Sequence, residues 1–174
     1  MTRIRLNYKW EDLSRSDKTS IITAAMMKNI YINGNGYRIG LPEINVNIGK
    51  NKNNLRIDIL EINKRKNVLI GYEVKSCIQD FRTDKKWEKY LDLINQLYFV
   101  FDNETFENHK EEILEKIGNK AGIYIYNPDR DWIYFREGGR YLALEPKGEE
   151  FYRIILFNYL LRNAYKHFNN IEIK

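Results

Sequence analysis

The segment "RIDILEINKRKNVLIGYEVKS", residues 56–76, constrains the fold of this chain more than any other. It contains two runs of alternating apolar residues joined by a charged stretch, a pattern that predicts a β-hairpin. Three charged residues, Asp58, Glu73 and Lys75, lie inside the predicted strands rather than in the turn. Strand interiors favour β-branched and aromatic residues, so these charges need a separate explanation.

Counting across the turn places the two acids opposite each other. A four-residue loop, residues 64–67, would pair Asn63 with Val68. Facing residues of an antiparallel pair have position numbers with a constant sum, so the same register sets Asp58 opposite Glu73. Their Cβ atoms would then be about 5 Å apart. We therefore expect two carboxylates at one place on the hairpin.

One face of the hairpin is expected to be polar and the other apolar. Side chains alternate between the faces of a strand, so Lys75 shares a face with Glu73, and Gly71 should leave open space beside them. Two carboxylates this close repel each other unless a cation lies between them. The alternative is a cross-strand salt bridge of Lys75 on a solvated sheet face, since isolated triplets of this kind are common by chance.

The composition restricts the kind of metal that such a site could hold. The chain has 174 residues, one cysteine (Cys77) and two histidines (His109 and His167), which excludes zinc sites built from several thiolates or imidazoles. Oxygen ligands favour a hard ion, and we predict Mg²⁺ or Mn²⁺. An ion held by two carboxylates beside a lysine suits metal-assisted hydrolysis of a phosphodiester.

The charge of the chain favours a polyanionic partner. Its net charge is +5, which would also be compatible with ordinary surface solvation. Four basic residues follow the hairpin and are candidates for phosphate contacts, with Lys86 favoured: Arg82, Lys85, Lys86 and Lys89. The charge therefore favours a nucleic acid as the partner, slightly ahead of surface solvation alone.

The order of predicted elements indicates a single α/β domain over residues 1–174. We expect helices at residues 17–32, 83–94, 107–117 and 147–167, and strands at residues 37–48, 54–63, 67–76, 96–102, 121–126 and 132–136. The start of the chain has no apolar leader segment, and no apolar run is long enough to span a membrane, so we expect a soluble cytoplasmic protein.

Asp58 followed by Glu73-Val74-Lys75 across a hairpin resembles the signature of the PD-(D/E)xK nuclease superfamily. The stretch "EVKSCIQDFRTDKKWEKYLDLINQLYFVF", residues 73–101, resembles the central block of the MmcB-like DNA repair proteins. Arg56-Ile57-Asp58 is similar to that family's Arg-x-Asp strand, and Glu43 lies where the family carries a Glu on the preceding strand. The position before Asp58, a proline in the classical motif, is an isoleucine here.

The resemblance implies a restriction-endonuclease-like fold: a mixed central sheet flanked by helices, with an αβββαβ core. It implies a metal site formed by Asp58 and Glu73, with the Val74 carbonyl and Glu43 as possible further ligands. It also implies that Lys75 positions the attacking water.

The predicted function is therefore a metal-dependent nuclease that processes DNA, acting in DNA repair. The alternative is a catalytically inactive module of the same fold that binds DNA or docks a repair partner. An RNA-directed nuclease and a homodimer also remain open, because a fold does not determine its substrate.

Overall fold

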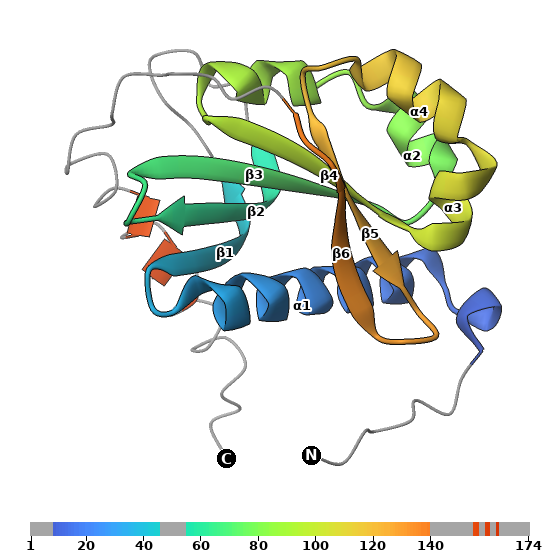
Figure 1. The fold of residues 1–174 in the computed structure, drawn as a ribbon, viewed down its shortest axis with the longest axis horizontal. Helices are drawn as coiled ribbons and strands as arrows, with labels where there is room; N and C mark the ends of the chain where they lie inside the picture. Colours follow the sequence, from blue (N-terminus) through green and yellow to red (C-terminus); the bar gives the residue numbers. More distant parts are fainter. Residues whose placement is uncertain (1–8, 46–54, 140–154, 157–158, 161–162, 164–174) are drawn as a thin grey trace, which may run out of the picture.

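One mixed sheet of six strands forms the centre of the fold, in the order β1-β2-β3-β4-β5-β6 (Figure 1). The computed structural model describes residues 9–45, 55–139, 155–156, 159–160 and 163. The pairs β1–β2, β2–β3 and β5–β6 are antiparallel, and β3–β4 and β4–β5 are parallel. The strands are β1 (Arg38–Asn45), β2 (Arg56–Asn63), β3 (Val68–Lys75), β4 (Gln96–Asp102), β5 (Gly122–Asn127) and β6 (Trp132–Glu137).

Helices cover both faces of this sheet (Figure 1). The long helix α1 (Arg15–Gly34) lies on one face, and the other face is covered by α2 (Ile78–Thr83), the 3₁₀ helix η2 (Trp87–Asp92), α3 (Asn103–Asn108) and α4 (Lys110–Ile117). A short 3₁₀ turn, η1 (Trp10–Asp12), precedes α1. The predicted mixed α/β architecture is confirmed, and the series α1-β1-β2-β3-α2-β4 follows the expected order.

A side-chain cap sets the start of helix α1, and residues with positive φ set its end. Ser14 is its N-cap, and the Ser14 hydroxyl accepts a hydrogen bond from the backbone N–H of Asp17 at 3.2 Å. At the other end Asn35 adopts the left-handed conformation with φ of 45°, and Gly36 follows with φ of 77°. These two residues stop the helix and turn the chain into β1.

The sheet separates two apolar clusters, one on each face. Ile22, Met26 and Ile30 of α1 pack on the face that carries Tyr72 and Val74. The opposite cluster joins apolar residues of α2, η2, α3 and α4 to the strands: Leu69, Phe81, Trp87, Phe99, Phe101, Phe106 and Ile113. Strand β3 is buried along its whole length. Both faces of β3 are therefore covered, so the alternative interpretation of a salt bridge on a solvated sheet face is wrong.

The expected open space at Gly71 is also wrong. A Cβ atom at this position would lie 2.6 Å from Cδ1 of Ile94 and 3.3 Å from Cδ1 of Leu97. A side chain at this position would have to displace the ends of Ile94 and Leu97, which already fill the volume beside β3.

The observed register of the β2–β3 hairpin agrees with the register predicted by counting residues across the turn. Asn63 pairs with Val68, and the ladder continues to Ile59 opposite Tyr72. The next pair in this series would be Asp58 and Glu73, where backbone pairing between β2 and β3 ends.

Two of the predicted helices are interrupted. The helix expected at residues 83–94 is wrong: α2 ends at Thr83, and a separate 3₁₀ helix, η2, begins at Trp87. The helix expected at residues 107–117 starts earlier and is divided at His109 into α3 and α4.

Parts of three further predictions fall outside the described residues. These are residues 46–48 and 54 of the predicted strands and most of the helix expected at residues 147–167. Within that last range, the described residues 155–156, 159–160 and 163 are helical, and Ile155 is buried against the cluster that contains Phe81. In the part of the chain that the structure describes, no helix combines the length and apolar character needed to cross a membrane.

Candidate active site

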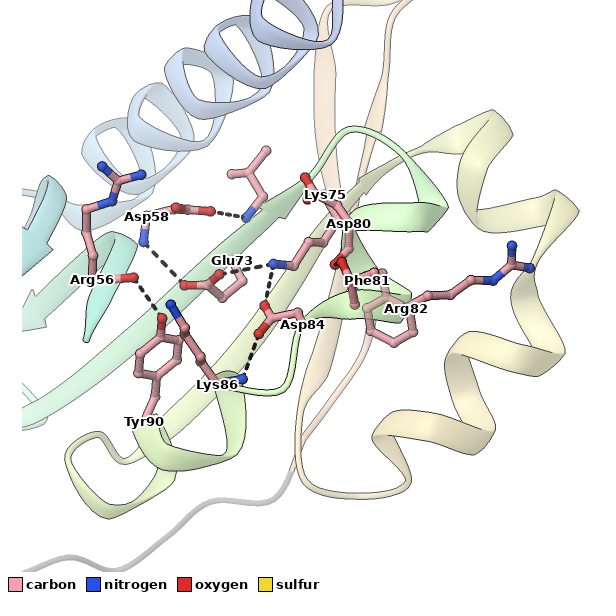
Figure 2. A network of polar contacts seen from close by, with 12 residues as sticks. Arg56, Asp58, Glu73, Lys75, Asp80, Phe81, Arg82, Asp84, Lys86 and Tyr90 are labelled. Carbon is pink, nitrogen blue, oxygen red and sulfur yellow. Dashed lines mark hydrogen bonds and ion pairs between the residues drawn. The ribbon is translucent and has the colours of Figure 1, made fainter. Parts of the chain in front are cut away.

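The candidate site lies where β2 and β3 diverge, and two carboxylates replace the backbone ladder there (Figure 2). Oδ2 of Asp58 accepts a hydrogen bond from the backbone N–H of Val74 at 2.9 Å. The backbone N–H of Asp58 donates in turn to Oε1 of Glu73 at 3.4 Å. Each acid is thus bonded to the opposite strand, which fixes the pair at the point of divergence.

Lys75 lies between Glu73 and a third acid, Asp84. Its Nζ is 3.3 Å from Oε2 of Glu73 and 2.6 Å from Oδ2 of Asp84. The alkyl stem of Lys75 is buried, and the ammonium lies 5.9 Å from the centre of the Phe99 ring. We call these four side chains, Asp58, Glu73, Lys75 and Asp84, the acid cluster.

Asp84 lies in the short turn that separates α2 from η2, and this turn holds it in place. Its Oδ1 accepts the backbone N–H of Lys86 at 2.9 Å, so one carboxylate both orders the turn and binds Lys75. From α4, Nζ of Lys116 donates to the carbonyls of Phe81, Arg82 and Asp84 at the end of α2. A lysine in this position satisfies carbonyls that the last helical turn leaves free.

The acid cluster has three carboxylates and one ammonium group, and burial intensifies their interactions. Glu73 is only 4% exposed, and Lys75 is 6% exposed. Burial, and then the neighbouring charge of Asp58, raise the pKa of Glu73 to about 8. Burial also raises the pKa of Asp58, although the hydrogen bond from Val74 opposes that change.

The other pair of groups in the cluster remains charged. Burial favours the neutral form of Lys75, but the carboxylates of Glu73 and Asp84 outweigh it and raise the pKa of Lys75. Burial would likewise raise the pKa of Asp84, but the hydrogen bond and charge of Lys75 reverse this and lower it. Lys75 and Asp84 thus form an ion pair, and within the described part of the chain no second cation bonds Asp58 or Glu73.

The donor set of Asp58 and Glu73 fits a hard divalent ion. Mg²⁺ is commonly held by one or two carboxylates, with water and phosphate oxygens completing its shell. Within the described residues, no group of three or more His, Cys, Asp or Glu side chains is arranged to hold a metal ion. A metal here would therefore depend on two carboxylates and on oxygens from the backbone, water or substrate. The Val74 carbonyl stays a prediction as one of those oxygens.

Glu43 lies opposite Asp58 in the register of β1 and β2, between the pairs Pro42–Ile59 and Ile44–Ile57. The ladder skips this position, and Glu43 adopts a φ of 50°, which is unfavourable for a residue with a side chain. Its side chain is exposed. The register brings Glu43 next to the site, but its role as a metal ligand stays a prediction.

The predicted phosphate-binding residues differ in their surroundings. Arg82 forms two bonds of 2.6 Å with the Glu112 carboxylate and points away from the acid cluster (Figure 2). Figure 2 shows the Lys86 side chain extending toward Glu73. Lys85 is exposed in the connection between α2 and η2, and Lys89 is exposed on η2. Of these four residues, Lys86 is best placed to contact a phosphate at the site, and Arg82 would first have to leave Glu112.

Sequence reasoning missed Asp84 and Tyr90. Asp84 stands directly before a basic helical stretch, and aspartate at such a position often caps a helix, which was the available signal. Tyr90 is buried and donates its hydroxyl to the carbonyl of Arg56 at 2.8 Å, which ties η2 to the start of β2. Nothing in the sequence alone indicates that second contact.

The family model described as "DNA repair protein MmcB-like" matches residues 12–116, which is more than half of the chain and includes the whole acid cluster. Among solved structures, a protein of unknown function from Silicibacter pomeroyi is similar, with a TM-score of 0.62 and 16% identity. That match covers 93% of this chain and 98% of the other, and at this identity it supports the fold alone. No curated protein matches the chain.

Proposed function

This chain belongs to the MmcB-like DNA repair protein family, and from that premise we propose that it is a metal-dependent nuclease that hydrolyses phosphodiester bonds in DNA. The proposal includes membership of the PD-(D/E)xK superfamily and a restriction-endonuclease-like fold. The order α1-β1-β2-β3-α2-β4 supports that fold assignment.

The observation that carries the proposal is that, among the described residues, Lys75 is the one cation bonded to the pair Asp58 and Glu73, and Asp84 shares it. Two buried carboxylates in contact with each other's strands are costly unless a cation or a proton balances them. Lys75 cannot balance both, because Asp84 holds its ammonium at 2.6 Å. A purely structural sheet would gain nothing from this arrangement, whereas a site that receives a divalent ion requires it.

Each residue of the cluster has a distinct part in this proposal. Asp58 and Glu73 would hold Mg²⁺ or Mn²⁺, and such an ion supplies an acidified water and stabilises charge on a phosphate. Lys75 would orient the attacking water and stabilise developing negative charge. Asp84 is a positioning residue, because it fixes the ammonium of Lys75.

Substrate would approach from the side of Asp58. Asp58 is the more exposed of the two acids, and Arg56 and Lys86 are exposed cations beside it. Figure 2 shows Lys86 on this side of Glu73. A phosphate bound by Lys86 would therefore lie close to the acid cluster and not on a distant part of the protein surface.

The proposal is tested with a panel of labelled DNA substrates that includes duplex, flap, junction and single strand, each with Mg²⁺, Mn²⁺ or EDTA. We expect cleavage of at least one substrate with metal and none in EDTA. Asp58→Asn keeps an acceptor for the Val74 N–H but removes the charge, and Lys75→Met keeps the alkyl stem over Phe99. Both variants should lose at least about 100-fold in rate.

Asp12→Asn is the matched control, because Asp12 is an exposed acid outside the acid cluster. It should cleave like the wild type. Metal-dependent cleavage at the wild-type rate by both cluster variants would disprove the proposal. DNA binding that persists in EDTA without cleavage of any substrate would favour a non-catalytic binding module.

A further inference from the structure

A polar cavity of about 370 Å³ lies on the face of the sheet opposite the acid cluster. It is bounded by the α1–β1 connection and the β2–β3 turn, which meet at the same end of the sheet (Figure 1). The backbone N–H of Lys64 in that turn donates to the carbonyl of Tyr37 at 2.9 Å and joins the two segments. We call this cavity the tyrosine pocket.

A satisfied ion pair forms part of its wall. The Arg38 guanidinium donates to both oxygens of Glu61, at 2.6 and 2.7 Å, and the Tyr72 hydroxyl donates to the same carboxylate at 2.7 Å. Glu61 is fully buried. Because its charge is already balanced, Glu61 does not make the pocket attractive to cations.

Aromatic rings form a second part of the wall. Tyr72 and Tyr98 stack with ring centres 5.6 Å apart, and Tyr124 meets Tyr98 edge-on at 5.2 Å. Gly122 makes this possible, since a Cβ there would lie 2.5 Å from the Tyr98 ring. Tyr37 also lines the pocket and is 54% exposed, so its ring can receive a planar ligand.

The rim of the pocket is positively charged. Arg65 and Lys66, both exposed in the β2–β3 turn, line it, and among the described residues Glu61, which is paired with Arg38, is the one acid that does so. The amide side chains of Asn33 and Gln96 also face the pocket and offer donors and acceptors. The lining therefore combines aromatic surface, neutral polar groups and a surplus of positive charge.

We propose that the tyrosine pocket binds a nucleotide, with its base against the Tyr37 ring and its phosphate against Arg65 and Lys66. Bases stack on aromatic side chains, and amide side chains read their edges. The volume lies within the range of small-ligand pockets. The nucleotide could be free or could be one unit of a single DNA strand, because both present the same chemistry.

This inference goes beyond the proposed nuclease function and does not depend on it. Neighbouring residues of β3 point to opposite faces, so Tyr72 contributes to the pocket while Glu73 contributes to the acid cluster. Binding at the pocket can therefore be measured in EDTA, where a metal-dependent cleavage reaction is absent.

The test is a titration of the full ¹⁵N-labelled chain in EDTA with dAMP and, separately, with the single strand (dA)₆. We expect the backbone amides of Arg38, Gln96 and Tyr124 to shift on saturation. Tyr37→Ala and Lys66→Ala should each weaken binding about tenfold, the size expected for loss of one stacking or phosphate contact. Both residues are exposed, so the unperturbed spectrum should report an intact fold.

Two matched controls separate the pocket from general surface effects. Tyr31→Ala removes an exposed tyrosine of α1, and Lys64→Ala removes an exposed lysine of the same turn, neither of which lines the pocket. Both should bind like the wild type.

The two probes distinguish the source of the nucleotide. Comparable affinity for dAMP and (dA)₆ supports a free nucleotide, and pocket shifts with (dA)₆ alone support a strand. Absence of pocket shifts with either probe would overturn the proposal. So would inorganic phosphate that reproduces the dAMP shifts at the same concentration, or control variants that weaken binding as much as the pocket variants.

Discussion

Glu61 on β2 and Glu73 on β3 are both buried glutamates of the same sheet, and their charges are balanced in opposite ways. Glu61 receives two bonds from Arg38 and one from the Tyr72 hydroxyl. Glu73 lies against Asp58 and shares the ammonium of Lys75 with Asp84. One carboxylate is fully satisfied by the protein, and the other is left with too little positive charge.

The contrast shows that burial by itself does not mark a functional acid. Both glutamates are less than 5% exposed. What differs is whether the one cation within bonding distance is shared: Arg38 bonds Glu61 alone, whereas Lys75 is divided between Glu73 and Asp84. A buried carboxylate whose charge is only partly balanced tends to bind a proton or an ion. The surroundings of Glu61 stabilise the fold, whereas those of Glu73 are where we propose that a metal ion binds.

The largest expected effect comes from replacing each glutamate by glutamine. Glu61→Gln leaves the Arg38 guanidinium without a counter-charge, so the free energy of unfolding should fall by about 3 kcal/mol. Glu73→Gln removes a repulsive charge and should leave the metal-free protein at least as stable as the wild type at pH 8. Urea unfolding in EDTA measures both, and equal losses in the two variants would contradict the comparison.

A divalent ion should raise the free energy of unfolding through Asp58 and Glu73, and not through Glu61. At an Mg²⁺ or Mn²⁺ concentration 100 times the dissociation constant, the wild type should gain about 2.7 kcal/mol. Glu73→Gln and Asp58→Asn should lose this gain, and Glu61→Gln should keep it. Thermal unfolding with and without metal is the measurement, and a metal response retained by Glu73→Gln would place the ion elsewhere.

The pH dependence of stability should sharpen the same distinction. The pKa of Glu73 is raised from an ordinary 4.5 to about 8 in the folded chain. Between these values the folded state keeps a proton that the unfolded state releases, so this group's contribution to stability falls as the pH rises toward 8.

Glu73→Gln removes that contribution. The free energy of unfolding of the variant, relative to the wild type, should therefore increase from pH 5 to pH 8 and then level off. Urea unfolding in EDTA at several pH values tests this, and parallel curves for the two proteins would refute it.

The smallest effect is expected at a second arginine–glutamate pair. The Arg82–Glu112 bonds, at 2.6 Å, match those of Arg38–Glu61 in geometry, but both partners are exposed. Exposed pairs contribute little, because water and salt screen them. Arg82→Ala should leave the unfolding midpoint unchanged in thermal melts, and a large loss would mean that geometry matters here more than burial.

Sequence reasoning succeeded where local rules decide the outcome. The four-residue turn at residues 64–67 fixes the hairpin register, so the Asn63–Val68 pair and the approach of Asp58 to Glu73 follow from counting. The strand Gln96–Asp102 was also predicted with its observed bounds, because a short apolar run between polar residues leaves little choice.

It failed where distant residues decide the outcome. The periodicity of residues 83–94 favours one helix, but the Asp84 carboxylate binds the N–H of Lys86, and Lys116 caps α2 from 32 or more residues away. Asp84 was missed for the same reason, since its contact with Lys75 exists only because the helix is broken there. Gly71 was misread because the residues that fill its space, Ile94 and Leu97, come from later in the chain.

The contact between Lys116 and the end of α2 connects α4 mechanically to the acid cluster. The connection runs from the Lys116 ammonium to the carbonyls of Phe81 and Asp84, and from the Asp84 carboxylate to Lys75. A force that shifts α4 against the sheet would therefore displace the Lys75 ammonium through Asp84, without any direct contact to Asp58 or Glu73. Tension applied to the outer surface of α4 would therefore reach a lysine that is only 6% exposed.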